Sequence, residues 1–256
     1  MAKGLLGAQL YTCRDFCKTI GDVARTLKKV AEIGYTAIQI SGFGPVDPKE
    51  VAKAVDDSGL TVAATHVGWD SFLNNLDALI AQHKLWKCSH PAIGGLPGEY
   101  YTADGLKRFL DEIPPVAEKL AAAGMDFSYH NHNHELRRIN GTTWLAALYE
   151  QGDPAHVKAE IDTYWIQAGG GDPAAWVRQC AGREPLLHLK DMAMGPNREQ
   201  RFAEIGEGNL NWPAILDAAE AGGVEYFLIE QDNCYERDPF ESLAISYRNL
   251  HAMGLR

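Results

Sequence analysis

The chain has 256 residues, of which 46% are hydrophobic and 23% charged, proportions that are ordinary for a globular protein with its own core. Its formal net charge of −10 disfavours extended contact with a nucleic-acid backbone or an anionic membrane, while leaving room for a small anionic substrate. We see no signal sequence at the N-terminus and no apolar run of membrane-spanning length, so we expect a cytoplasmic protein without nucleic-acid or membrane partners.

Helical and strand patterns alternate along the chain. Val23, Leu27 and Val30 recur at helical spacing, Gly34 is placed to end that helix, and residues 36–41 have the pattern of a strand. The same succession of helix, glycine and strand returns further along the chain. We therefore predict strands near residues 5–11, 36–41, 61–67, 88–93, 125–132, 157–162, 186–191 and 225–231.

Aspartate–proline pairs mark the starts of several helices. Asp47, Asp172 and Asp238 each precede a proline, and such a pair supplies an N-cap and a first-turn residue. The pair at residues 153–154 fits a turn instead. We predict the longest helix within residues 103–123.

Strand-then-helix units without a long linker predict an α/β fold, a single (β/α)8 TIM barrel over residues 1–256. The alternative is an open doubly wound sheet, which would carry a glycine-rich phosphate loop; residues 42–44 lack the rest of that motif. The five cysteines form neither a disulfide framework nor a zinc ribbon, so we expect free thiols.

Residues 127–135 carry the most informative pattern. His130, His132 and His134 occupy alternate positions, so a strand would point all three to one face, and Glu135 follows at once. Imidazoles bind metals and transfer protons near neutral pH, whereas the alternative is a solvated histidine-rich loop. The apolar residues before His130 favour a buried strand that becomes polar at its C-terminal end, where barrel enzymes hold their active sites.

Similar polar residues stand at the C-terminal ends of the other predicted strands, and a barrel would bring them to one mouth. They are Gln39, His66, His130, His132, Glu135, Glu160, Asp162, His188, Lys190, Asp191, Glu230 and Asp232. Carboxylates and an imidazole from several strands suit Mn²⁺, Mg²⁺ or Zn²⁺. The residues alone therefore predict that Asp162, His188 and Glu230 bind a metal ion.

The remaining polar residues have other interpretations. We interpret Glu160 as a partner in an ion pair inside the barrel rather than as a metal ligand. Asp191 and Asp232 lie one position past the inward-facing residues, so we expect them in loops or caps. His134 is predicted at the surface.

The chain resembles the xylose-isomerase-like TIM-barrel superfamily, and within it the sugar phosphate isomerase/epimerase proteins near inosose dehydratase. The resemblance covers nearly the whole chain and is most specific between residues 125 and 232. The segments that carry it are YHNH with a following glutamate at 129–135, EIDTYW at 160–165, LHLKD at 187–191, EIGEGNLNW at 204–212 and IEQD at 229–232.

The resemblance implies one divalent metal ion, most often Mn²⁺, with Mg²⁺, Zn²⁺ or Co²⁺ as alternatives. Carried over to this sequence, its ligands are Glu135, Asp162, His188 and Glu230. The related epimerases place their first glutamate inside the fifth strand, where this chain has His130, so His130 or His132 is the alternative ligand.

One departure bears on the reaction. The related epimerases carry a histidine shortly after the sixth-strand aspartate, where this chain has Trp165. Relatives with the histidine-rich fifth strand resemble enzymes that act on inososes or 3-keto-glycosides by proton abstraction and elimination. A dehydratase or lyase is therefore the alternative to an epimerase.

The resemblance and the residues together predict an enzyme that isomerises or epimerises a keto-sugar or polyol through an enediolate, with the metal ion as Lewis acid. His130 is the first candidate for the base, His132 the second, and Lys190 acts beside them. His66, Gln39 and Trp165 are the expected substrate contacts.

The partner is thus a small sugar or polyol, and a homo-oligomer is a further expectation. Two other classes remain as alternatives: an endonuclease-like phosphodiesterase and a non-catalytic sugar-binding barrel.

Overall fold

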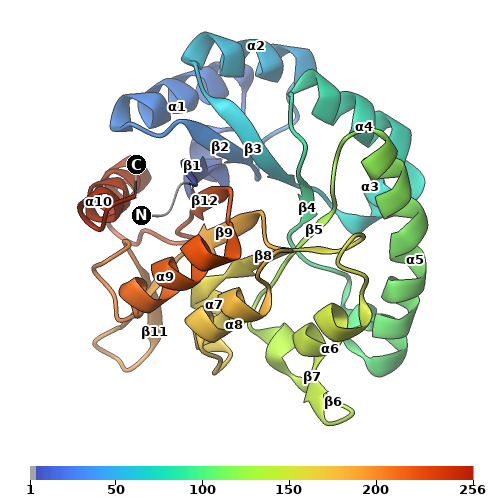
Figure 1. The fold of residues 1–256 in the computed structure, drawn as a ribbon. Coiled ribbons are helices and arrows are strands. Elements are labelled where there is room, and N and C mark those ends of the chain that lie inside the picture. Colours follow the sequence, from blue (N-terminus) through green and yellow to red (C-terminus); the bar gives the residue numbers. More distant parts are fainter. Residues whose placement is uncertain (1–3, 256) are drawn as a thin grey trace.

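Short runs of buried apolar residues form the barrel strands in the computed structural model, which describes residues 4–255 (Figure 1). They are β1 (Leu5–Gln9), β2 (Ala37–Ile40), β3 (Thr61–His66), β4 (Pro91–Ile93), β5 (Ser128–His130), β8 (Lys158–Asp162), β9 (Leu186–Leu189) and β12 (Tyr226–Ile229). They pair in parallel in the order β1-β12-β9-β8-β5-β4-β3-β2 and close into a barrel. The predicted (β/α)8 barrel is confirmed.

The helices form an outer ring around the strands (Figure 1). They are α1 (Ile20–Ile33), α2 (Pro48–Ser58), α3 (Trp69–Asn74), α4 (Leu76–Leu85), α5 (Ala103–Ala122), α6 (Trp144–Gln151), α7 (Thr163–Ala168), α8 (Pro173–Gln179), α9 (Trp212–Gly222) and α10 (Pro239–Ala252). Short 3-10 helices span Leu10–Phe16, Gly98–Tyr101 and His134–Leu136. None of the helices in this described part of the chain is both long and apolar enough to span a bilayer.

The predicted helix boundaries rest on side-chain caps. Asp47, Asp172 and Asp238 each accept backbone N–H hydrogen bonds at the starts of α2, α8 and α10. Gly34 follows α1 with φ of +121°, a conformation that favours glycine. The longest helix, α5, lies where we predicted it, and the described cysteines are free thiols.

The chain departs from the predicted pattern after two strands. The predicted strand at 186–191 ends at Leu189, and Asp191 begins a hairpin of β10 (Asp191–Met194) and β11 (Gln200–Ala203). A second hairpin, β6 (Arg138–Ile139) and β7 (Thr142–Thr143), follows β5.

A carboxylate explains where β9 stops. Asp191 is fully buried and accepts backbone N–H bonds from Gly206, Gly208 and Leu210, and an indole N–H from Trp212. These bonds tie the return of the hairpin to the end of β9. Asp191 therefore has the loop-organising role that its position in the sequence predicted.

An aromatic cluster fills the layer between α5 and the neighbouring strands. Trp69, Phe109 and Phe127 pack edge to face or tilted, with ring centroids 4.9–6.3 Å apart. All three are nearly fully buried. A second, smaller apolar cluster lies on the strands themselves and comprises Ala37, Ala63, Ala64, Leu186 and Leu228.

An ion pair at the opposite end of the barrel gives the fold a pH dependence. His90 Nδ1 lies 2.9 Å from Asp126 Oδ2. Burial alone would lower the pKa of His90, but the hydrogen bond to Asp126 and the neighbouring carboxylates raise it above its ordinary value of 6.5. This pair therefore stabilises the fold fully below pH 6.5, and that contribution is lost as pH rises through the folded-state pKa.

We predict that His90→Gln lowers the free energy of unfolding by about 1 kcal/mol at acidic pH, as expected of a partly exposed, charge-assisted hydrogen bond. The difference from wild type should shrink as pH rises above 6.5, in urea unfolding curves recorded across pH. Asp126→Asn should reproduce this pH dependence; a difference that grows with pH would contradict the assignment.

Candidate active site at the C-terminal ends of the strands

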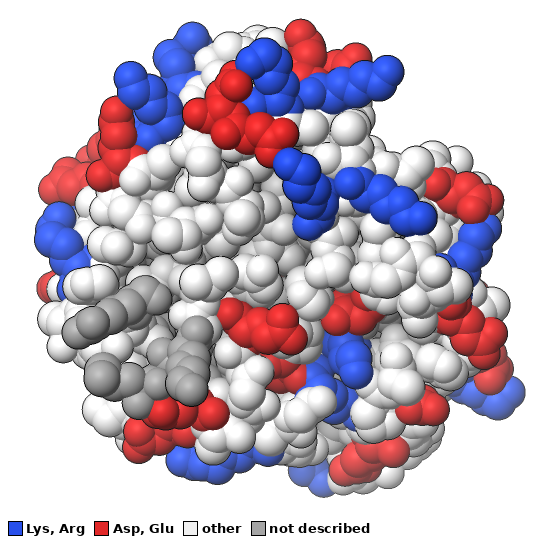
Figure 2. Space-filling model, turned by 45° about the horizontal axis from the view of Figure 1, so that its top comes forward, with Lys and Arg blue, Asp and Glu red and all other residues white. Residues whose placement is uncertain are grey.

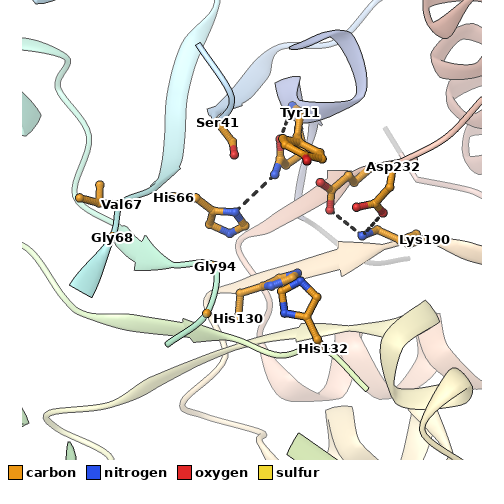
Figure 3. Close-up of a pocket in the computed structure, with 13 residues that line it drawn as sticks. Tyr11, Ser41, His66, Val67, Gly68, Gly94, His130, His132, Lys190 and Asp232 are labelled. Carbon is orange, nitrogen blue, oxygen red and sulfur yellow. Dashed lines mark hydrogen bonds and ion pairs between the residues drawn. The ribbon is translucent and has the colours of Figure 1, made fainter. Parts of the chain in front are cut away.

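A cavity of about 500 Å³ opens at the C-terminal ends of the barrel strands (Figure 3). Its polar lining comes from β1, β2, β3, β5, β9, β12 and the segments that follow them. These residues are Gln9, Tyr11, Ser41, His66, His130, His132, Lys190, Glu230 and Asp232. The volume lies within the usual range for small-molecule sites.

Glu160, on β8, organises the floor of this cavity from below. It is fully buried, and its two oxygens accept hydrogen bonds from Gln39 Nε2 at 2.8 Å and His66 Nε2 at 2.8 Å. His188 Nε2 lies 3.2 Å from the same carboxylate. Burial alone would raise the pKa of Glu160, but the histidines hold it well below its usual range. The interior ion pair predicted for Glu160 is therefore present.

These contacts fix which imidazole nitrogens carry hydrogen. Nε2 of His188 faces Gln39 Oε1 at 2.6 Å as well as Glu160, and both are acceptors, so this nitrogen must donate. Nδ1 of His188 is thereby aimed at Glu230 Oε2, 3.2 Å away, and Asp162 Oδ2, 3.7 Å away. A carboxylate behind the imidazole is the arrangement that orients metal-binding histidines.

Asp162 is held by the start of the next helix. Its Oδ1 accepts the N–H of Trp165 as the N-cap of α7, which leaves Oδ2 facing the site. There it lies 3.3 Å from His130 Nε2 and 3.0 Å from Lys190 Nζ. Burial would raise its pKa, yet the Lys190 charge and the histidine hydrogen bonds keep it well below the usual range.

Lys190 is completely buried among three carboxylates. Its Nζ lies 2.7 Å from Glu230 Oε2, 2.7 Å from Asp232 Oδ2 and 3.0 Å from Asp162 (Figure 3). Burial alone would lower the pKa of Lys190, but these acids raise it above its ordinary value, so the side chain is a permanent ammonium. Asp232 lies in a loop, as we expected, and it also lines the cavity.

Two histidines of β5 and the following loop face the cavity as neutral imidazoles. Burial, with the charge of His188, lowers the pKa of His130 to about 4. Burial, with His130 and Lys190, lowers the pKa of His132 to about 3. Within residues 4–255, Nδ1 of each has no hydrogen-bond partner. Each therefore offers a free nitrogen to a ligand.

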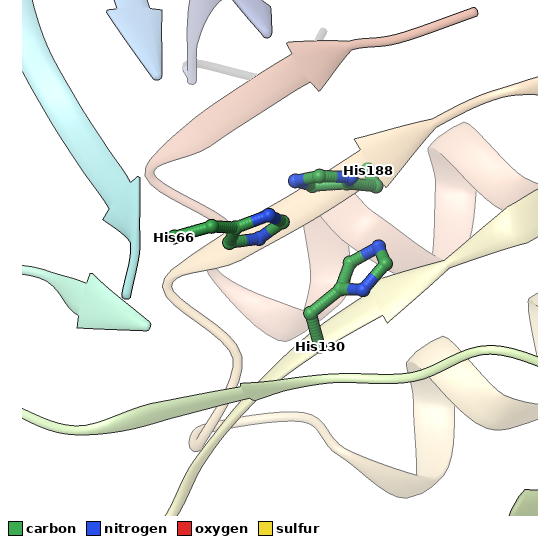
Figure 4. A group of neighbouring side chains, drawn as sticks. All are labelled: His66, His130 and His188. Carbon is green, nitrogen blue, oxygen red and sulfur yellow. The ribbon is translucent and has the colours of Figure 1, made fainter. Parts of the chain in front are cut away.

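The rings of His66, His130 and His188 converge from β3, β5 and β9 (Figure 4). Their centroids lie 4.4–5.3 Å apart, and ligand atoms of all three fall within 4.8 Å of one another. A second group, His130, Asp162, His188 and Glu230, meets the same criterion and is fully buried. Two imidazoles and two carboxylates form a donor set suited to a divalent ion such as Mn²⁺ or Zn²⁺.

Charge supports this interpretation of the second group. The carboxylates of Glu160, Asp162, Glu230 and Asp232 cluster around one ammonium, Lys190, and one imidazolium, His188, whose pKa the acids raise well above 6.5 despite burial and which would release a proton on binding a metal ion. Two negative charges are left in excess, which is costly in a buried site. The donor set therefore fits a divalent cation.

Three expected site residues lie elsewhere. Glu135 is outside both groups: it accepts hydrogen bonds from Tyr129 Oη and the His132 N–H, and burial raises its pKa to about 7. Glu135 lies in the 3-10 helix His134–Leu136, beyond the end of β5, whereas His130 on β5 belongs to both groups. Gln39 is fully buried beneath the cavity and orients His188 instead of lining it.

Trp165, the third, stands behind the lining. Its ring centroid is 5.2 Å from that of His132, and Lys190 Nζ lies 5.4 Å from its ring. Phe202, at the β10–β11 hairpin, completes this aromatic wall by stacking on Tyr164 at 4.2 Å. His134 is exposed, as predicted.

Sequence reasoning missed several lining residues. Gln9 and Ser41 stand just at or after the ends of β1 and β2, so the rule that singled out the other strand ends could have found them. Gly94 and Gly95 carry no side-chain signal, although Gly94 lies so close to His66 that an added Cβ would come within 3.1 Å of Nδ1. Tyr11 lies in a 3-10 helix that we predicted as strand.

Known proteins share this fold and this arrangement of elements. A family model described as "Xylose isomerase-like TIM barrel" matches residues 27–244. An inosose dehydratase of Geobacillus kaustophilus (strain HTA426) is 22% identical over 191 residues, covering 66% of this chain and 61% of that protein. The chain thus spans less than two thirds of the length of that curated relative.

Solved structures agree on the fold. A sugar phosphate isomerase/epimerase from Parabacteroides distasonis ATCC 8503 superposes with a TM-score of 0.83 at 24% identity, over 99% of this chain and 96% of that one. A structure described as L-ribulose 3-epimerase gives a TM-score of 0.74 at 21% identity, over 98% and 94%. At these identities the likeness is one of fold.

We predict that Glu160→Gln lowers the free energy of unfolding by about 3 kcal/mol near pH 7, because it removes one partner of a buried ion pair. The loss should shrink as pH falls below 4.5 toward the depressed folded-state pKa, since the charged form is what stabilises the fold. Urea unfolding at several pH values measures both effects.

Glu184→Gln is the matched control. Glu184 is also buried, but burial raises its pKa well above 4.5, which favours the neutral carboxyl group that an amide replaces closely. Its cost should stay below about 1 kcal/mol. Equal decreases in the free energy of unfolding in the two variants would show that the charge of Glu160 does not stabilise the fold.

Proposed function

Because the chain belongs to the xylose isomerase-like TIM barrel family, we propose that it is a divalent-metal-dependent isomerase or epimerase of a keto-sugar or related polyol. The observation that carries the proposal is the meeting of ligand atoms from His130, Asp162, His188 and Glu230 within 4.8 Å of one another, beside a cavity that His130, His132 and Glu230 line. A binding site, a base and room for a small ligand thus coincide.

The proposed ligands are held before any cation arrives. Glu160 and Gln39 fix the ring of His188, and the start of α7 fixes Asp162. When bound, the cation would supply Lewis-acid stabilisation of the negative charge that develops on a carbonyl oxygen.

His132 is the proposed base. It is neutral near pH 7 and its free Nδ1 belongs to a residue that lines the cavity, so it can take the proton from the carbon next to a carbonyl. A pKa of about 3 makes a weak base, which suits only a C–H bond already acidified by the carbonyl. Return of the proton to the other face or the other carbon gives an epimer or an isomer.

Lys190 and His66 are the proposed partners of the substrate oxygens. The ammonium of Lys190 is a fixed positive charge at the cavity wall, where charge on oxygen develops as the enediolate forms. His66 donates through Nε2 to Glu160, so its Nδ1 is an acceptor for a substrate hydroxyl.

Water elimination from an inosose is the second candidate, because the curated relative is described as an inosose dehydratase. It begins with the same proton abstraction and differs in the loss of a β-hydroxyl group. A nuclease is disfavoured because Lys and Arg alternate with Asp and Glu over the face drawn in Figure 2, without a continuous basic stripe.

We predict that the protein binds one Mn²⁺ per chain and that His130→Ala weakens this binding by more than about 100-fold, since a ligand counts for at least as much as its supporting residues. Glu135→Gln should leave the affinity unchanged. Titration calorimetry of metal-stripped protein measures both. Loss of Mn²⁺ in Glu135→Gln with retention in His130→Ala would reverse our choice of ligand.

We predict that Mn²⁺-loaded enzyme exchanges the proton next to the carbonyl of a ketose or inosose with deuterated solvent, observed by NMR. His132→Asn should slow this exchange by about 10²–10⁴-fold while metal binding persists. His134→Asn, an exposed histidine of the same motif, is the control and should exchange normally. Unchanged exchange in His132→Asn would remove it from the mechanism.

A further inference from the structure

One part of the cavity wall is uncharged. It is formed by Tyr11, Ser41, Val67, Gly68, Gly94 and Gly95, which offer hydroxyl groups, backbone amides and bare backbone. Gln9 adds an amide whose Nε2 is 3.5 Å from His66 Nδ1. Groups of this kind recognise hydroxyls by hydrogen bonds and supply no charge to a phosphate.

The single cation among the residues that line this cavity is already engaged. Lys190 lies within 3.0 Å of three carboxylates, which outnumber its single charge. Two of these carboxylates, Glu230 and Asp232, line the same cavity. The site as a whole therefore repels a dianion.

Neighbouring features do not supply a phosphate site either. Arg14 packs its guanidinium 4.2 Å over the ring of Tyr11, and its Nη1 donates to the carbonyls of Tyr11 and Asp232. The two short helices that begin at the mouth each carry an acid in their first turn, Asp70 and Glu99, where an anion would otherwise be favoured.

We propose that the substrate is an unphosphorylated polyhydroxy carbonyl compound, and that the site rejects its phosphate esters. The inference rests on the proposed function and narrows it. The proposed substrate therefore differs from the phosphorylated sugar that the description of one structural neighbour, a sugar phosphate isomerase/epimerase, suggests. The discriminating elements are the excess of buried carboxylates and the uncharged wall.

The test compares pairs of compounds that differ only by a terminal phosphate, such as ribulose with ribulose 5-phosphate and fructose with fructose 6-phosphate. Calorimetry on Mn²⁺-loaded protein should give at least about tenfold tighter binding of the neutral member. Raising the salt concentration from about 20 mM to about 500 mM should narrow the gap, because screening weakens the repulsion of the ester.

A charge added to the wall should reverse the preference. Ser41→Lys places an ammonium on the neutral side and should tighten binding of the ester relative to the neutral sugar, whereas Ser41→Gln should preserve the discrimination. Arg14→Met should also preserve it. If Arg14→Met weakens an ester that wild-type protein binds well, Arg14 is a phosphate ligand and the inference is overturned.

The outcomes separate this inference from the proposed function. Equal or tighter binding of the esters by wild-type protein overturns the inference, and proton exchange with esters alone does so while leaving the isomerase intact. If the protein binds the neutral sugars in preference but catalyses proton exchange with neither the sugars nor their esters, the proposed function is overturned and the inference is supported. Binding of neither member of any pair overturns both.

Discussion

The site depends on one buried carboxylate that three neighbours share. Glu160 holds Gln39, His66 and His188 at once, and it does so from the barrel interior, where water cannot compete. Because an ionised carboxylate only accepts hydrogen bonds, each neighbour must donate to it, which fixes the protonated nitrogen of two imidazoles. The other nitrogens of those rings are left facing the chemistry. A neutral residue at this position would lose both the charge and the direction of these bonds.

Next to this carboxylate, the buried side chains carry more negative than positive charges. Asp162, Glu230 and Asp232 surround Lys190, and the acids still outnumber the cations. We propose that this imbalance attracts a divalent ion to the floor of the cavity and repels an anionic substrate from its mouth. Both follow from the same residues, so a change at Asp232 would alter metal affinity and substrate preference in concert.

Much of the fold and part of the site could be predicted because the parallel strands impose one simple rule. A strand that ends in polar residues delivers them to the same end of the barrel, and that rule found Asp162, His188, Lys190 and Glu230. It failed where the chain leaves the strand. Glu135 lies in a short 3-10 helix and Asp232 lies in a loop. The alternation of a strand therefore does not determine which way either side chain points. Gln39 points into the barrel as the rule predicts, but it lies below the cavity, because the alternation of side chains does not indicate how deeply a residue is buried. The β10–β11 hairpin was missed because residues 200–203 alone do not show that their partner is Asp191–Met194.

The hydrogen bonds that Asp191 accepts at the base of the β10–β11 hairpin have a consequence for the tip of the hairpin. Four N–H groups donate to Asp191 and so hold both ends of the hairpin to the barrel. We therefore expect movements of the hairpin tip not to reach β9 and the site. We therefore expect insertions or deletions between residues 195 and 199 to leave the positions of His188 and Lys190 unchanged. A change at Phe202, which stacks on Tyr164 and lies near Lys190, would instead alter the aromatic wall beside the cavity.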